Sequence, residues 1–107
     1  DTDWGQILQL YDQLLSVTPT PVVALNRAVA LAEIEGPAPA LVAIEGLDLD
    51  GYAPFHVTRG ELFARLGSTD TAAEEYDKAI ALTANEAERR FLVERRDGIA
   101  DRADADS

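Results

Sequence analysis

The chain has 107 residues, 47% of them apolar, which is enough for one modest hydrophobic core. Twenty acidic residues against nine basic ones give a net charge of −11, so direct binding to nucleic acid is not expected of this surface. Without cysteine the chain excludes disulfides and thiolate metal sites, and no apolar run approaches the roughly 18 residues of a membrane span. These features predict a cytoplasmic protein that makes no membrane contact.

The first two helices are predicted from their boundary residues. Apolar residues at helical spacing predict a helix over residues 4–17, with Asp3 as its N-cap. Thr20 and Pro21 are typical of a helix start, and Gly36 of a helix end, so a second helix is expected over residues 21–35.

Four shorter or more polar helices are predicted in the rest of the chain, with a capping box at Thr71 and Glu74 and an N-cap at Asn85. Phe91 and Leu92 are the expected apolar anchors of the last helix. The expected helices cover residues 38–47, 52–66, 71–82 and 85–96, and an acidic, flexible tail is expected over 97–107. No segment shows strand alternation, so the predicted class is all-α, with one helical domain over 1–96.

Two segments repeat each other at an offset of 65 residues. In Tyr11–Pro19 and Tyr76–Ala84, an aromatic residue is followed by an apolar residue at +3 and by a proline or small residue at +8. This pattern resembles the second helix of a tetratricopeptide (TPR) repeat, whose period is about 34 residues. The expected architecture is therefore a set of TPR-like antiparallel hairpins with about six helices. Small residues at 60, 72 and 79 are expected to let helices approach closely, and Phe63 and Tyr76 are expected to fill the gaps between them.

In this register, residues 4–17 are the second helix of a repeat whose first helix is absent. The chain contains no methionine and begins at Asp1, and we expect it to be part of a longer protein. Either the second helix and its neighbours cover the apolar stripe of the first helix, or a patch remains for another chain or for the rest of the protein, and self-association through this helix is one expectation.

No motif in the chain predicts an enzyme, a metal site or a cofactor site. His56 is expected to be a packing residue, because a catalytic base needs a partner and a substrate pocket. Asp48–Gly51 lacks the first and last ligands of a calcium loop and is interpreted as a turn. The adjacent Glu74 and Glu75 are interpreted as solvated acids on a helix surface.

The predicted function is protein contact through the concave face of the repeats. Asn26 and Arg27 interrupt an otherwise apolar helix, and a polar side chain there is suited to bind a partner's backbone or carboxylate. The alternatives are that Asn26 bonds a neighbouring loop and that Arg27 extends to solvent. The candidate contact residues are Asn26, Arg27, Glu33, Glu61 and Arg65.

The chain also resembles one particular family over residues 2–96. Its most specific segment is Val23-Ala24-Leu25-Asn26-Arg27-Ala28-Val29-Ala30, and further matching segments are Thr2-Asp3-Trp4, Leu10-Tyr11-Asp12, Gly36-Pro37-Ala38, Leu66-Gly67 and Asn85-Glu86-Ala87-Glu88-Arg89-Arg90-Phe91-Leu92. These residues are similar to the C-terminal TPR-like extension domain of extracytoplasmic-function (ECF) sigma factors.

The resemblance implies a regulatory domain of a bacterial transcription initiation factor. Its partners would be the remainder of its own sigma factor and RNA polymerase, and the regions that bind DNA would lie before Asp1. The alternative function is a free-standing TPR adaptor that binds a peptide in its concave groove.

Overall fold

The protein is described by a computed structural model that covers the backbone of residues 2–106 and the side chains of residues 2–102. These residues form six α-helices and no strand, which confirms the predicted all-α class. The helices divide into an N-terminal unit, Asp1–Leu49, and a C-terminal unit, Asp50–Ser107, each of which is described by itself. None of the helices within the described residues has the length and apolarity needed to cross a lipid bilayer.

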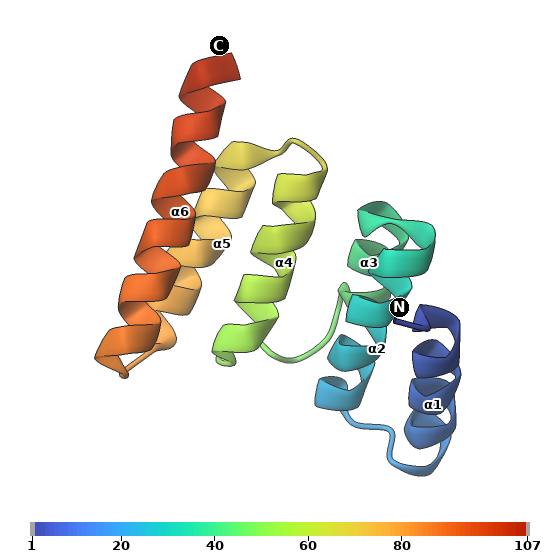
Figure 1. Ribbon diagram of the computed structural model, residues 1–107. Coiled ribbons are helices and arrows are strands. Elements are labelled where there is room, and N and C mark those ends of the chain that lie inside the picture. Colours follow the sequence, from blue (N-terminus) through green and yellow to red (C-terminus); the bar gives the residue numbers. More distant parts are fainter. Residues whose placement is uncertain (1, 107) are drawn as a thin grey trace. The chain divides into compact units, whose positions relative to one another are not determined.

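The N-terminal unit contains α1 (Trp4–Val17), α2 (Pro21–Glu35) and α3 (Pro37–Ile44), with α2 packed against both of the others (Figure 1). The predicted N-caps are confirmed: Asp3 accepts a hydrogen bond from the Gln6 amide at 3.0 Å, and Thr20 accepts one from the Val23 amide at 3.2 Å. The core lies between α2 and α3, whereas α1 contributes no fully buried residue. The buried apolar residues of α2 and α3 that form this core are Leu25, Ala28, Ala30, Leu31, Ala32, Ala40, Leu41 and Ile44.

Gly36 is the only residue between α2 and α3. It is the C-cap of α2, with its amide bonded to the Ala32 carbonyl at 3.0 Å, and it is also the N-cap of α3. Its φ of 93° lies in the left-handed region, which glycine adopts without the penalty of a side chain. The third helix ends at Ile44, three residues before the predicted Leu47.

The C-terminal unit contains α4 (Ala53–Arg65), α5 (Thr69–Leu82) and α6 (Glu86–Asp106), with α5 packed against α4 and α6 (Figure 1). Asn85 caps α6 as predicted, accepting a hydrogen bond from the Glu88 amide at 3.0 Å. The predicted capping box at Thr71 is wrong, because α5 begins two residues earlier, at Thr69, with Ser68 as its N-cap. The core of this unit consists of Ala72, Tyr76, Ala79, Ile80, Leu92 and Ile99.

The last helix continues well beyond its predicted end. The expected flexible tail from Asp97 is wrong, because α6 is helical to Asp106. The physical reason is that Ile99 lies seven residues after Leu92, on the same face of the helix, and is fully buried in the core. Of the expected tail, Ser107 lies outside the described residues.

Candidate protein-contact surfaces

The most specific segment of the sequence, residues 23–30, lies in α2. Four exposed residues of this helix are spaced by four, three and four positions, so they share one side of it. We call these four residues the α2 stripe: Val22, Asn26, Val29 and Glu33. Asn26 thus presents an amide that donates and accepts hydrogen bonds, between two valines that are 37% and 42% exposed. A polar group between apolar neighbours is suited to contact another protein.

Arg27 does not belong to the α2 stripe. Its Nε donates to Oδ1 of Asp12 at 2.5 Å, so the pair links α2 to α1. From the sequence, Arg27 was expected either to contact a partner or to extend to solvent. The structure places its guanidinium in a partly exposed ion pair within the N-terminal unit, where the expected contribution to stability is small.

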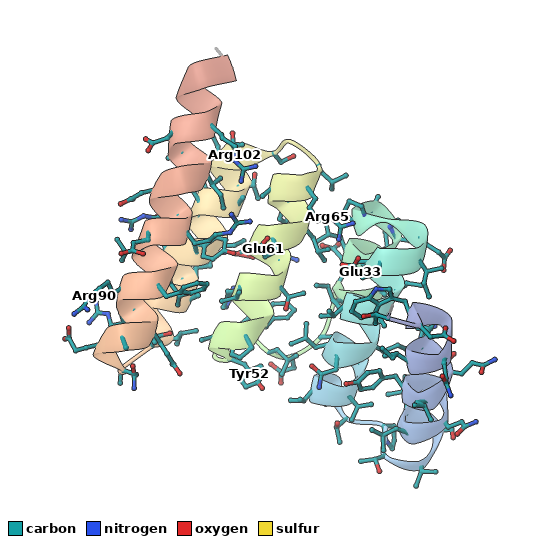
Figure 2. The ribbon with its side chains drawn as sticks, viewed as in Figure 1. Glu33, Tyr52, Glu61, Arg65, Arg90 and Arg102 are labelled. Carbon is teal, nitrogen blue, oxygen red and sulfur yellow. The ribbon has the colours of Figure 1, made fainter. Side chains whose placement is uncertain are left out.

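Glu61, which was also expected to line the contact face, lies in a network inside the C-terminal unit (Figure 2). Nε and Nη2 of Arg95 donate to its two carboxylate oxygens at 2.7 and 2.8 Å, and the hydroxyl of the buried Tyr76 donates to Oε1. The hydrogen bond from Arg95 is the main reason that the pKa of Glu61 is lowered, against the opposing effect of burial. Glu61 therefore joins α4 to α5 and α6.

The two remaining candidates lie on separate units. Glu33 is the last member of the α2 stripe, and Arg65 is an exposed residue in the last turn of α4 (Figure 2). Of the five candidates, the structure therefore brings Asn26 and Glu33 together on one helix side. It assigns Arg27 and Glu61 to ion pairs within their own units.

Glu75 is a buried carboxylate that the sequence pattern did not predict. Glu75 was interpreted as solvated, but it is 2% exposed, and it lies on the same side of α5 as the buried Ala72 and Ala79. Burial raises the pKa of Glu75, but hydrogen bonds from Arg59 and Lys78 outweigh it and the pKa is lowered. The local signal was its position, three residues after one small core residue and four before another.

His56 and Arg59 surround Glu75 from α4. His56 is 5% exposed, which confirms the predicted packing position, and its Nε2 lies 2.7 Å from the Asp50 carbonyl oxygen. Its Nδ1 lies 3.5 Å from Oε2 of Glu75. Arg59 pairs with Oε1 of Glu75, and its guanidinium lies 5.6 and 5.3 Å from the ring centroids of Phe55 and Phe63. The group forms a buried junction between α4 and α5.

An apolar pocket of about 550 Å³ lies between the first two turns of α4 and the first two turns of α6. Its walls are formed by Ala53, Pro54, Val57 and Thr58 of α4, by Thr83, and by Ala87, Glu88, Phe91 and Leu92 of α6. The expected anchor role of Phe91 is wrong, since its side chain is 66% exposed, whereas Leu92 is buried as predicted. A volume of this size is typical of sites that accept a small ligand or a few side chains of a peptide.

The chain is similar to an uncharacterized protein, R00370, of Rhizobium meliloti (strain 1021). The two sequences are 43% identical over 101 residues, which is 92% of this chain but only 24% of the relative. The chain therefore spans about a quarter of the length of this relative. No protein-family model and no solved structure matches the chain.

Proposed function

We propose that this chain is the regulatory C-terminal extension of a bacterial ECF sigma factor, and that it tunes promoter-dependent transcription initiation through protein contacts. The observation that carries the proposal is the α2 stripe. The segment most similar to these sigma factors, residues 23–30, carries Asn26 on the exposed side of a helix whose opposite side is buried. Because Asn26 is exposed, its amide is accessible to donate and accept hydrogen bonds with a partner.

Two further observations support this proposal. The similar Rhizobium protein extends far beyond the matched region, which leaves room for the regions that bind polymerase and promoter DNA. With a net charge of −11, this domain is expected to contact protein and to leave DNA binding to those other regions. A cytoplasmic location follows from the proposal.

The first test is the coding sequence that flanks this chain. Two helical regions with a basic helix-turn-helix before Asp1 are expected. A series of further repeats of about 34 residues would contradict the sigma-factor assignment and favour an adaptor.

The second test uses the full-length protein in promoter-dependent transcription with purified RNA polymerase. Asn26→Arg is expected to lower transcript yield about tenfold or more, because a long cation replaces the amide in the contact. Ala43→Arg, at an exposed position of α3, adds the same charge to the same unit and is expected to leave the yield unchanged. Equal effects of the two variants would contradict a specific contact at Asn26.

The pocket between α4 and α6 favours a second candidate, a TPR adaptor that binds an extended peptide. Its mostly apolar walls and the exposed ring of Phe91 suit an apolar peptide side chain. Fluorescence anisotropy with a panel of labelled peptides would then show saturable binding that Phe91→Ala weakens. Leu82→Ala, which removes another exposed apolar side chain of this unit, is the control.

A further inference from the structure

The pocket between α4 and α6 offers a ligand mainly one kind of polar side-chain contact. It lies at the end of the C-terminal unit where α4 and α6 begin and α5 ends (Figure 1). The polar side chains that line it are Thr58, Thr83 and Glu88. The Thr58 hydroxyl donates to the Pro54 carbonyl at 2.9 Å, and the Thr83 hydroxyl donates to the Ala79 carbonyl at 2.7 Å. Both hydroxyl oxygens are therefore left to a ligand as acceptors, and the Glu88 carboxylate is an acceptor as well.

The charge at the pocket favours a cation. None of the described residues that line it is Lys or Arg, although Arg89 and Arg90 follow Glu88 along the chain. The starts of α4 and α6 each contribute about half a positive charge, and the end of α5 contributes about half a negative one. The sum of these helix dipoles is about half a positive charge, which the carboxylates of Glu86 and Glu88 in the first turn of α6 exceed.

Phe91 supplies an aromatic ring to the same wall of the pocket. Its side chain is 66% exposed, so a ligand in the pocket can reach the ring. The face of an aromatic ring attracts a cation, and it does so most strongly where water is excluded. An accessible ring beside a carboxylate and two hydroxyl acceptors is an arrangement suited to an organic ammonium ion.

The size of the pocket favours a small molecule as its occupant. One helical turn beyond the pocket, Glu61 lies four residues after Val57 on α4, and Arg95 lies four residues after Phe91 on α6. Nε and Nη2 of Arg95 donate to both carboxylate oxygens of Glu61, so this pair closes the apolar surface at that end. An extended peptide would have to cross the ion pair, whereas a small molecule fits within the 550 Å³ of the pocket.

We propose that the pocket between α4 and α6 binds a small organic cation, which is a molecule with a protonated amine on an apolar body. The body packs against Ala53, Val57 and Leu92, and the ammonium group donates to the Glu88 carboxylate beside the ring of Phe91. The proposal goes beyond the functions proposed above and rests on the pocket alone. Its tests use single small molecules, so their outcome is independent of the transcription and peptide experiments.

Three probes with one phenylbutyl body and different head groups test the site: phenylbutylamine, phenylbutanol and phenylbutyrate. Each is titrated into the whole chain at neutral pH and about 150 mM salt, which screens the general attraction of an acidic protein for cations. Backbone amide NMR signals report both the affinity and the location. The amine is expected to bind with a dissociation constant of about 0.1–1 mM, about fivefold or more tighter than the alcohol, and to shift the amides of Thr58, Ala87 and Phe91.

The anionic probe, phenylbutyrate, is expected to bind more weakly than the alcohol, because its carboxylate would face the carboxylate of Glu88. Equal affinities for the amine and phenylbutyrate would overturn the assignment of a cation. Signal shifts confined to the N-terminal unit, or no saturation of any probe by about 10 mM, would overturn the pocket as the site.

Glu88→Gln tests the source of the charge, and glutamine is equally suited to the third position of a helix. The variant is expected to weaken amine binding about fivefold or more and to leave alcohol binding unchanged, which shows that the pocket is intact. Glu86→Gln is the matched control, because it removes the same charge from the same turn of α6 but lies outside the pocket lining. It is expected to change amine binding by less than about twofold. Equal losses in the two variants would show only a general attraction between charges and would overturn the proposal.

Phe91→Leu tests the aromatic ring while keeping an apolar wall. It is expected to weaken amine binding about twofold to fivefold more than alcohol binding, which is the range of a cation–π contact at a partly exposed site. An equal effect on the two probes would place the ammonium group away from the ring and contradict the proposed orientation.

Discussion

The absence of a side chain at Gly60 makes room for the ring of Tyr76. A Cβ at residue 60 would lie 2.7 Å from Cε2 and 2.8 Å from Cδ2 of that ring, which is closer than carbon atoms approach without displacement. Tyr76 is 1% exposed and is held at its hydroxyl by Glu61, so the ring has little freedom to move. This contact sets how closely α4 and α5 approach each other.

Gly60→Ala is therefore expected to lower the free energy of unfolding by about 1–3 kcal/mol, as overpacking in a core does. The matched control is Gly98→Ala in α6, where a Cβ would meet no atom within 4 Å. That substitution is expected to be neutral or to stabilise by up to about 1 kcal/mol, since alanine favours a helix more than glycine does. Urea denaturation followed by circular dichroism measures both, and equal effects would contradict the close approach.

Tyr76→Ala is expected to lower the free energy of unfolding by about 3–5 kcal/mol, because it empties the centre of the C-terminal core. Tyr76→Phe keeps the ring and removes only the hydroxyl that donates to Glu61, so a smaller loss of about 0.5–1.5 kcal/mol is expected. Thermal or urea unfolding distinguishes the two. A loss below about 1 kcal/mol for Tyr76→Ala would contradict the register assigned to the repeat.

Glu75→Ala is expected to cost about 3–5 kcal/mol, because it leaves the Arg59 guanidinium partly buried without its carboxylate. Its neighbour provides the control: Glu74 is exposed, and Glu74→Ala is expected to change the free energy of unfolding by no more than about 0.5 kcal/mol. Equilibrium denaturation of both variants at neutral pH makes the comparison. Similar values for the two would show that Glu75 is solvated, as its sequence context suggested.

Acid is expected to destabilise the C-terminal unit through Glu61 and Glu75. Both carboxyls have a pKa below the ordinary 4.5 in the folded chain, so ionisation stabilises the fold above that pH. That contribution is lost as the pH falls below 4.5 and through the lowered pKa values of the folded state.

Glu61→Gln tests the acid effect. This variant is expected to be less stable than the unmodified chain at pH 7 and to lose less stability on acidification. Glu94→Gln, at an exposed position of α6, is the control for the change in net charge. Denaturation midpoints measured between about pH 7 and 3 show the difference in slope. Identical slopes for Glu61→Gln and the unmodified chain would exclude Glu61 as a source of the acid sensitivity.

Ile99→Ala tests the corrected end of α6. Its side chain is fully buried, so the substitution is expected to cost about 2–5 kcal/mol, whereas Asp101→Ala at an exposed position is expected to have almost no effect. Removal of residues 97–107 is expected to lower the melting temperature. If the shortened chain melts at the same temperature, residues 97–107 behave as the flexible tail that their composition predicts.

The features that the sequence predicts well in this chain are those set by residues close together along the chain. The caps at Asp3, Thr20 and Asn85 were predicted because the capping side chain and the amide it binds are three residues apart, so no tertiary information is needed. The packing role of Tyr76 followed from its spacing to small residues. The TPR-like arrangement of the hairpins remains a prediction.

What the sequence did not predict depends on contacts between helices. Glu75 was assigned to the surface because it is charged, and only its partners on α4 explain why it is buried. Glu61 was placed on a contact face from its position in the repeat, and its partner Arg95 lies 34 residues away, where local spacing gives no sign of the pair. Phe91 and Leu92 are adjacent apolar residues, and the choice of which one enters the core depends on the orientation of α6 against α5.

The single residue that joins α2 and α3 restricts how this chain can vary in length. Gly36 serves both helices, so an inserted residue there would not be absorbed by a loop. It would instead turn α3 about its axis by roughly 100° and carry Ile44 and Ala40 away from the core. Insertions and deletions among homologous chains are therefore expected between residues 45 and 52, where no helix is present, and not at the junction of α2 and α3.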